Sequence, residues 1–344
     1  MKFGIFDHVD KSDRPLNKQF AERLDYVKLA DEAGFYCYHV AEHHATPLNM
    51  VPVPGVYLGA VARATKRMRL GPLVYLLPLY SPLRLVEEIA MLDHLSDGRL
   101  DVGVGRGVSP FELNFHKVKA EESRDIFLDA YAALRAGLSQ EKMSHSGTYF
   151  TYENVPIELH PLQKPFPPFW YPSSNEGGAQ WAGEQGLHFV TLGAMATASK
   201  AITAFKAAFA KRGKAESPKP EFPGGIVIGV NRQIVVAPTD AEAEAIARPA
   251  REQHHDSLMK LQRENKGGPL YTRSIPASYE DSVGGGALIV GSPETVLRGI
   301  ERQVKELGIN YMSAALFFGH MTADHAMRSL RLFASEVLPK VEKL

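Results

Sequence analysis

The sequence has a single cysteine and no excess of charge of either sign. With Cys37 alone, an internal disulfide is impossible and a metal cluster held by several thiolates is excluded. The 39 lysines and arginines balance 39 aspartates and glutamates, so there is no basic surplus to hold nucleic acid or anionic lipid by long-range attraction. We therefore expect the partner to be a small molecule.

Long apolar runs are also lacking. No run approaches the roughly 18 residues that a membrane helix needs. The first residues include the strand-like Phe3-Gly4-Ile5-Phe6 and lack the basic segment, long apolar core and small-residue cleavage site of a signal peptide. We expect a soluble, cytoplasmic protein that binds neither membrane nor nucleic acid.

Strand-like segments recur at a regular spacing, and each is followed by loop and helix signals. In the first of these units, residues 17–33 carry apolar side chains at helical spacing. A β/α repeat of this kind builds a parallel sheet, which can be a closed barrel or an open doubly wound sheet. Eight repeats favour an eight-stranded (β/α)8 TIM barrel of the α/β class. The eight strand candidates span residues 2–6, 35–40, 68–75, 100–104, 168–172, 187–192, 225–237 and 310–318.

Two stretches interrupt this repeat. Residues 143–167, rich in proline, tyrosine and phenylalanine, predict a hairpin insertion. Residues 262–286 carry Gly267-Gly268-Pro269 and Gly284-Gly285-Gly286 and predict a long mobile loop, which we interpret as a lid over the barrel mouth. Since no linker separates domains, residues 1–344 should form a single barrel domain.

The working residues of such a barrel follow its strands, at their carboxyl ends. Ala41-Glu42-His43-His44 follows the second predicted strand. His43 should lie at the pocket-facing end of this strand, and the near-neutral pKa of an imidazole suits proton transfer. For His44 we expect a hydrogen-bonded residue at a packed or subunit interface.

The segments after the fourth and fifth predicted strands indicate an anion site. Ser174 or Asn175 can cap a helix that runs to about Gln185, and the free N–H groups at its start would cradle a phosphate. Ordinary capping is the more frequent use of these residue types. Arg106 lies between glycines that allow a ligand to approach closely, so it could meet the same phosphate from the neighbouring loop.

Two other interpretations of these segments are disfavoured. The run from Gly103 to Gly107 has the spacing GxGxG rather than GxGxxG and follows the fourth strand, unlike a Rossmann fingerprint. His43 and His44 suggest a metal, but adjacent side chains point apart and the first strand carries no HxH. We predict no metal ligand.

Four segments together resemble the bacterial-luciferase-like, flavin-dependent monooxygenases. They are MKFGIF at residues 1–6, AEHH at 41–44, LGPLVYLLPLYSPLRLVEEIAMLDHLSDGRLDVGVGRG at 70–107 and GSPETV at 291–296. Members of that family are dimeric β/α barrels that use reduced FMN delivered by a separate reductase, or in some branches a deazaflavin. The resemblance implies an oxidoreductase, a homodimeric monooxygenase that uses reduced FMN and molecular oxygen to oxygenate a small organic substrate.

The resemblance also implies roles for individual residues. His43 matches the catalytic histidine, and the bond Leu73–Val74 matches a non-prolyl cis peptide of the family. In luciferases the position of Ser174 is acidic, which is a departure in this chain. The positions around the flavin phosphate are Arg106, Val108, Ser174, Asn175 and Gly178, and those at the floor of the isoalloxazine pocket are Phe6, Leu73, Val74 and Tyr75.

Three alternatives stay open at this point. The first is a deazaflavin-dependent dehydrogenase of the same fold, which would transfer hydride and need no oxygen. The second is a metal-dependent barrel hydrolase that uses His43 and His44, and the third is a flavin-binding protein without turnover. For the monooxygenase, the compatible substrates include aldehydes, sulfonates, amines and cyclic ketones.

Overall fold

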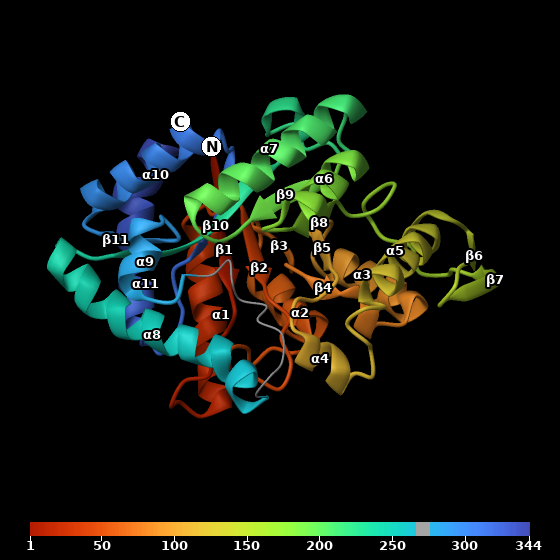
Figure 1. The fold of residues 1–344 in the computed structure, drawn as a ribbon, viewed down its shortest axis with the longest axis horizontal. Coiled ribbons are helices and arrows are strands. Elements are labelled where there is room, and N and C mark those ends of the chain that lie inside the picture. Colours follow the sequence, from red (N-terminus) through yellow and green to blue (C-terminus); the bar gives the residue numbers. More distant parts are fainter. Residues whose placement is uncertain (266–275) are drawn as a thin grey trace.

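Ten strands in the described part of the computed structural model form one sheet that curves into a barrel (Figure 1). The structure describes residues 1–265 and 276–344. The strands of this sheet are β1 (Lys2–Asp7), β2 (Cys37–Val40), β3 (Arg69–Pro72), β4 (Tyr75–Leu76), β5 (Val102–Gly105), β8 (Phe169–Pro172), β9 (His188–Thr191), β10 (Ile228–Val236), β11 (Leu288–Gly291) and β12 (Tyr311–Ala315). Their order is β3-β2-β1-β12-β10-β9-β8-β5-β4, and each of these pairs is parallel.

Closure of the barrel depends on the position shared by β3 and β4. A parallel bridge joins Leu70 in β3 to Leu100, just before β5. The predicted strand at 68–75 is in fact two short strands, and the cis peptide bond Leu73–Val74 lies between them. With β3 and β4 counted as one, eight positions surround the barrel, and the predicted α/β barrel class is confirmed.

One strand was not predicted. β11 pairs in parallel with β10 from Gln233 to Val236, beyond the residues of β10 that pair with β9. The strand-like run Leu288-Ile289-Val290 could have indicated it.

Helices cover the outside of the barrel, and the strands are therefore buried on both faces. Every residue of β2 and of β5 is buried, which explains their continuous apolar runs in place of alternation. Within the two described ranges, no helix has the length and apolarity needed to cross a membrane. The helices are α1 (Leu16–Glu32), α2 (Pro54–Ala64), α3 (Pro82–Leu95), α4 (Pro110–Phe115), α5 (Ser123–Ser139), α6 (Glu176–Gln185), α7 (Met195–Arg212), α8 (Asp240–Glu264), α9 (Tyr279–Gly284), α10 (Pro293–Leu307), α11 (Ala323–Leu332) and α12 (Leu338–Val341).

The two stretches that interrupt the repeat have different structures. The first holds an antiparallel hairpin of β6 (Lys142–Ser146) and β7 (Thr151–Pro156), which protrudes at the side of the barrel (Figure 1). The second, the predicted lid at 262–286, begins within α8 and ends beyond α9, and its residues 266–275 lie outside the described ranges.

A buried ion network holds the amino ends of several strands. The Asp101 carboxylate, fully buried, accepts from Arg69 at 2.7 Å and from Lys219 at 3.1 Å. Burial would raise the pKa of Asp101, but the two cations outweigh it and hold that pKa well below its ordinary value. Since function in such barrels gathers at the opposite end, we assign this network to stability.

Candidate active site

The carboxyl ends of the strands meet at the end of the molecule away from the N terminus. In Figure 1, β1 runs downward from the N terminus, and α4 and the end of α8 lie at the lower edge. The loops that follow β1, β2, β5 and β8 carry the residues considered below. This is the end at which barrels of this class place their chemistry.

The imidazole of His43 is paired with a carboxylate that the sequence analysis missed. Its Nδ1 lies 3.2 Å from Oε1 of Glu112 in α4, and Oε2 of Glu112 accepts the backbone N–H of His44 at 2.9 Å. Glu112 lies 69 residues away in the chain, so no local pattern indicated the pairing. Because Glu112 engages Nδ1, Nε2 is the ring nitrogen left for a bound ligand.

The pairing shifts both pKa values toward the ion pair. Burial alone would lower the pKa of His43, but the Glu112 carboxylate outweighs burial and raises it above its ordinary value. Burial alone would raise the pKa of Glu112, but His43 outweighs it and lowers that pKa. The His43 side chain keeps 20% of its surface exposed and Glu112 only 5%, so the imidazole is the accessible partner. It can donate or accept a proton at the pocket.

His44 points to a different carboxylate. Its Nε2 lies 2.9 Å from Oε1 of Glu42, whose Oε2 accepts the backbone N–H of Leu76 at 2.9 Å. The ring also contacts that of His116, with centroids 4.5 Å apart. Glu42 and His44 thus brace the ends of β2 and β4 against each other. The adjacent histidines point apart, as the sequence analysis expected.

The turn after β1 is built around the buried Asp7. Its carboxylate accepts the backbone N–H of Val9 at 2.7 Å, the Arg23 guanidinium at 3.0 Å and the Tyr38 hydroxyl at 3.0 Å. Val9 takes a left-handed conformation with φ 54°, which is unusual for a β-branched residue. The sequence analysis singled out nothing here, although Asp7-His8-Val9-Asp10 directly follows the first strand.

Two further histidines, His8 and His254, form a row of ring contacts with His43, and we call these three rings the histidine wall. The rings of His8 and His43 stack with centroids 5.7 Å apart, and His8 meets His254 of α8 at 5.0 Å. Nδ1 of His254 lies 2.7 Å from Oδ1 of Asp10. Burial, followed by the neighbouring His254, lowers the pKa of His8 well below its ordinary value. Residues from the loop after β2, the turn after β1, and α8 therefore meet at one place.

Of the four residues predicted at the floor of the flavin pocket, Tyr75 has a side chain that points elsewhere. Phe6, Leu73 and Val74 are buried, and the peptide bond Leu73–Val74 is cis, which confirms that expectation. A Cβ on Gly105 would lie 2.6 Å from Val74 Cγ2, so glycine lets these two segments approach. The Tyr75 side chain instead points toward α3, where its hydroxyl lies 2.7 Å from Glu88, so only its backbone could line the pocket.

The two loops of the predicted phosphate site are neighbours. β5 and β8 pair in the register Val102 to Phe169, which brings the residues after each strand to the same edge. Arg106 and Val108 are exposed. The Tyr171 hydroxyl next to this edge has its pKa raised by burial, an effect that the Arg106 and Arg124 guanidinium groups reduce. Arg124, at the start of α5, was not among the predicted residues.

The start of α6 presents backbone N–H groups that could bind an anion. The Asn175 side chain caps the helix by accepting the N–H of Gly178 at 2.8 Å. A Cβ on Gly178 would lie 2.4 Å from Ser173 Oγ, so glycine keeps this turn tight. The first N–H groups of a helix have no partner within it. Together with an exposed guanidinium on the next loop, they fit a phosphate group such as that of FMN.

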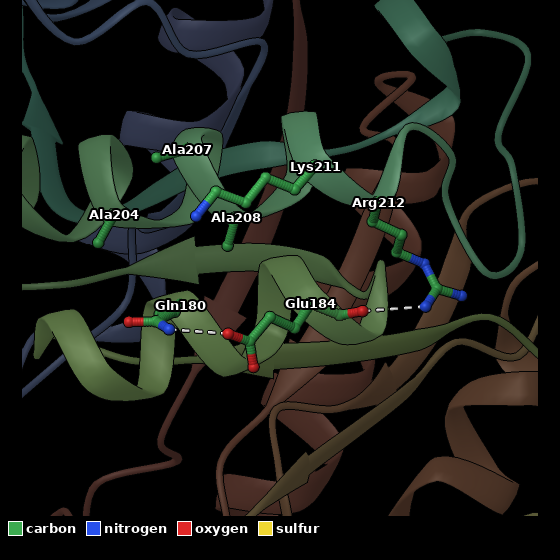
Figure 2. A pocket seen from close by; sticks show the side chains of 7 residues that line it. All are labelled: Gln180, Glu184, Ala204, Ala207, Ala208, Lys211 and Arg212. Carbon is green, nitrogen blue, oxygen red and sulfur yellow. Dashed lines mark hydrogen bonds between the residues drawn. The ribbon is translucent and has the colours of Figure 1, made fainter.

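One surface groove lies away from this edge. Figure 2 shows a groove between α6 and α7, with Gln180 and Glu184 on one side and Lys211 and Arg212 on the other. Glu184 accepts from Gln180 at 2.7 Å, and its backbone carbonyl accepts from Arg212 at 2.9 Å. The polar groups of this groove are thus largely engaged with one another, and we assign it no function.

Comparison with known proteins gives a consistent result. A family model described as luciferase-like monooxygenase matches residues 1–311. Uncharacterized protein y4wF of Sinorhizobium fredii is 32% identical over 341 residues, which cover 99% of this chain and 97% of that protein. The oxygenase component of flavin-dependent trigonelline monooxygenase from Acinetobacter baylyi is 29% identical over 192 residues, 55% of this chain and 53% of that protein.

A solved structure shares the whole fold. The oxygenating constituent of 3,6-diketocamphane monooxygenase from Pseudomonas putida, in complex with FMN, has a TM-score of 0.81 at 21% identity. The likeness covers 99% of this chain and 98% of that one.

Proposed function

Since the chain belongs to the luciferase-like monooxygenase family, we propose that it uses reduced FMN and molecular oxygen to oxygenate a small organic substrate. The observation that carries this proposal is the His43–Glu112 pair at the carboxyl end of β2, on the same edge as the paired loops after β5 and β8. When bound, reduced FMN supplies the electrons that activate oxygen. The protein supplies position, electrostatics and a dry pocket.

The FMN phosphate is proposed to bind where the loops after β5 and β8 adjoin. Arg106 would contribute a guanidinium, which matches phosphate geometry, and the start of α6 would contribute backbone N–H groups. Ser174 and Asn175 shape this turn, and Val108 would cover it from the neighbouring loop. The cofactor ring would lie against Phe6 and the cis bond between Leu73 and Val74.

His43 is proposed to move the proton in the reaction. Glu112 orients the ring through Nδ1, which leaves Nε2 to meet the ligand. The raised pKa of His43 keeps a protonated imidazole available near neutral pH, which suits donation to an oxygen atom that gains negative charge. Glu112 acts through His43 and is therefore a positioning residue.

A separate reductase and a second copy of this chain are the proposed partners. The similar trigonelline enzyme is an oxygenase component, which is the precedent for a reductase that delivers reduced flavin. For the homodimer, Val56 on α2 and Met91 on α3 are 78% and 55% exposed on helices that pack together. Exposed apolar side chains on adjacent helices are typical of a protein interface. Light scattering should give twice the chain mass for the wild type and the chain mass for Val56→Asp.

Oxygen uptake tests the function directly. Purified protein is mixed with chemically reduced FMN and a panel of aldehydes, sulfonates, amines and cyclic ketones, and products are identified by mass spectrometry with labelled oxygen. We expect one class to gain a labelled oxygen atom in an amount that scales with enzyme. Binding of a deazaflavin in place of FMN, or the absence of labelled product across the panel, would contradict the proposal.

A further inference from the structure

Three side chains of the kinds that ligate metals gather where β1 ends. His8 and Asp10 come from the turn after β1, and His254 comes from α8. One ligand atom from each lies within 4.8 Å of those of the other two. Asp10 is fully buried and His254 is 7% exposed. The proposed function uses none of these three residues.

The Asp10 carboxylate is only half satisfied. Its Oδ1 is engaged by Nδ1 of His254 at 2.7 Å, whereas its Oδ2 is buried and has no hydrogen-bond partner among the described residues. A buried carboxylate oxygen without a partner is costly, and buried polar atoms are normally satisfied by protein, water or an ion. Within residues 1–265 and 276–344, no group supplies that partner, which leaves room for a bound ion.

The surrounding structure holds the three side chains in place. The Asp10 carbonyl accepts from the Gln19 side chain at 2.6 Å, which fixes the turn after β1 against α1. Thr46 Oγ1 donates to the Ser257 carbonyl at 3.1 Å, which fixes α8 next to His254. The His8 ring meets Phe6 edge-on at 4.8 Å. A site assembled from two elements that are both held in place loses little entropy when an ion binds.

We propose that His8, Asp10 and His254 form a binding site for a divalent transition-metal ion of the Zn²⁺ class. Two imidazoles and one carboxylate are a ligand set that Zn²⁺ and Fe²⁺ accept, and three protein ligands leave at least one coordination position open. The ion replaces the hydrogen bond between His254 and Asp10, and both imidazoles turn a lone pair toward it.

The open position has a defined neighbour. His8 stacks on His43, so the ion would lie at the histidine wall, beside the proposed proton-transfer group. An oxygen atom of water or of a carboxylate or carbonyl substrate could complete its coordination. His43 and His44 themselves do not form this site, because each is paired with a different glutamate.

Metal titration tests the site without any assay of turnover. Protein treated with a chelator is titrated with Co²⁺ and with Zn²⁺, followed by visible absorption for Co²⁺ and by calorimetry for Zn²⁺. We expect one ion per chain and the visible bands of Co²⁺ bound to nitrogen ligands. Asp10→Asn and His254→Ala should each weaken binding by about tenfold or more, because each removes a ligand.

His255→Ala is the matched control, since His255 is the next residue of α8 and lies outside the cluster. It should bind both ions like the wild type, and circular dichroism should show all variants folded. A wild type that binds no ion, or a folded His254→Ala variant that binds as tightly as the wild type, would overturn the proposal. If a variant does not fold, the wild-type Co²⁺ spectrum decides alone: bands without nitrogen-ligand character refute the site.

Discussion

Replacing Glu112 by glutamine is the sharpest perturbation of the His43 pair, because it removes one charge and keeps the shape. Glutamine can accept a hydrogen bond from only one of the two groups that Glu112 now serves, His43 Nδ1 and the His44 backbone N–H. If the amide NH₂ faces His43, it donates to Nδ1 and the neutral ring carries its proton on Nε2. If it faces the His44 N–H, two donors oppose each other. Either arrangement weakens the orientation of His43.

The magnitude follows from the distance. Unit charges 3.2 Å apart attract by about 5 kcal/mol at an effective dielectric of 20. The net gain from the pair is smaller, because removing both charged groups from water costs free energy. Opposite charges at this range commonly shift a pKa by about one to three units. We therefore expect the pKa of His43 to fall in Glu112→Gln, because the variant removes the charge that raises it.

The sign of the stability effect can be worked out from both partners. The raised pKa of His43 gives a contribution that is complete below the ordinary histidine value of 6.5 and is lost as pH rises through the folded value. The lowered pKa of Glu112 gives a contribution that is complete above the ordinary glutamate value of 4.5 and is lost as pH falls. The loss of unfolding free energy in Glu112→Gln should therefore be greatest between pH 4.5 and 6.5.

Nuclear magnetic resonance of the histidine Cε1–H groups measures the pKa of His43 directly, with His43→Ala to assign the resonance. Glu121→Gln serves as control, because Glu121 is exposed in the loop just after α4. An unchanged His43 pKa in Glu112→Gln, with the protein folded, would refute the pairing and with it the orientation of Nε2.

Three further predictions concern other parts of the molecule. His43→Ala should leave folding and FMN affinity nearly intact and slow turnover by about a hundredfold or more, as measured by oxygen uptake; wild-type turnover would remove His43 from the chemistry. Arg106→Ala should weaken FMN binding by about tenfold in a fluorescence titration, because a charge-assisted contact is lost, whereas equal affinity would exclude Arg106 from the site. Asp101→Asn should lower the unfolding free energy at neutral pH by about 3 to 5 kcal/mol, measured by urea unfolding, since the buried Lys219 and the part-buried Arg69 lose their partner. The lowered pKa of Asp101 means that this difference should shrink as pH falls below the ordinary aspartate value of 3.8; a difference independent of pH would contradict the ion network.

The sequence by itself determined the architecture and part of the site. The barrel could be predicted because local patterns of apolar residues indicate each strand and helix. These patterns also show the regular β/α repeat and the strands that are buried on both faces. Asn175 caps a helix that ends at Gln185, as its position before that helix indicated. The cis bond at Leu73–Val74 followed from the family resemblance of the surrounding segment.

Only the tertiary structure decided which side chains meet. Periodicity shows which face of an element is buried but not what packs against it, so Glu112 could not be matched to His43 across 69 residues. For the same reason the contact between His254 and Asp10 could not be predicted. These residues are 244 positions apart, and the packing of α8 brings them together. Tyr75 was expected at the pocket floor, but the packing of α3 turns its side chain outward to Glu88. Local sequence sets the elements, and the long-range packing of these elements sets the chemistry at their ends.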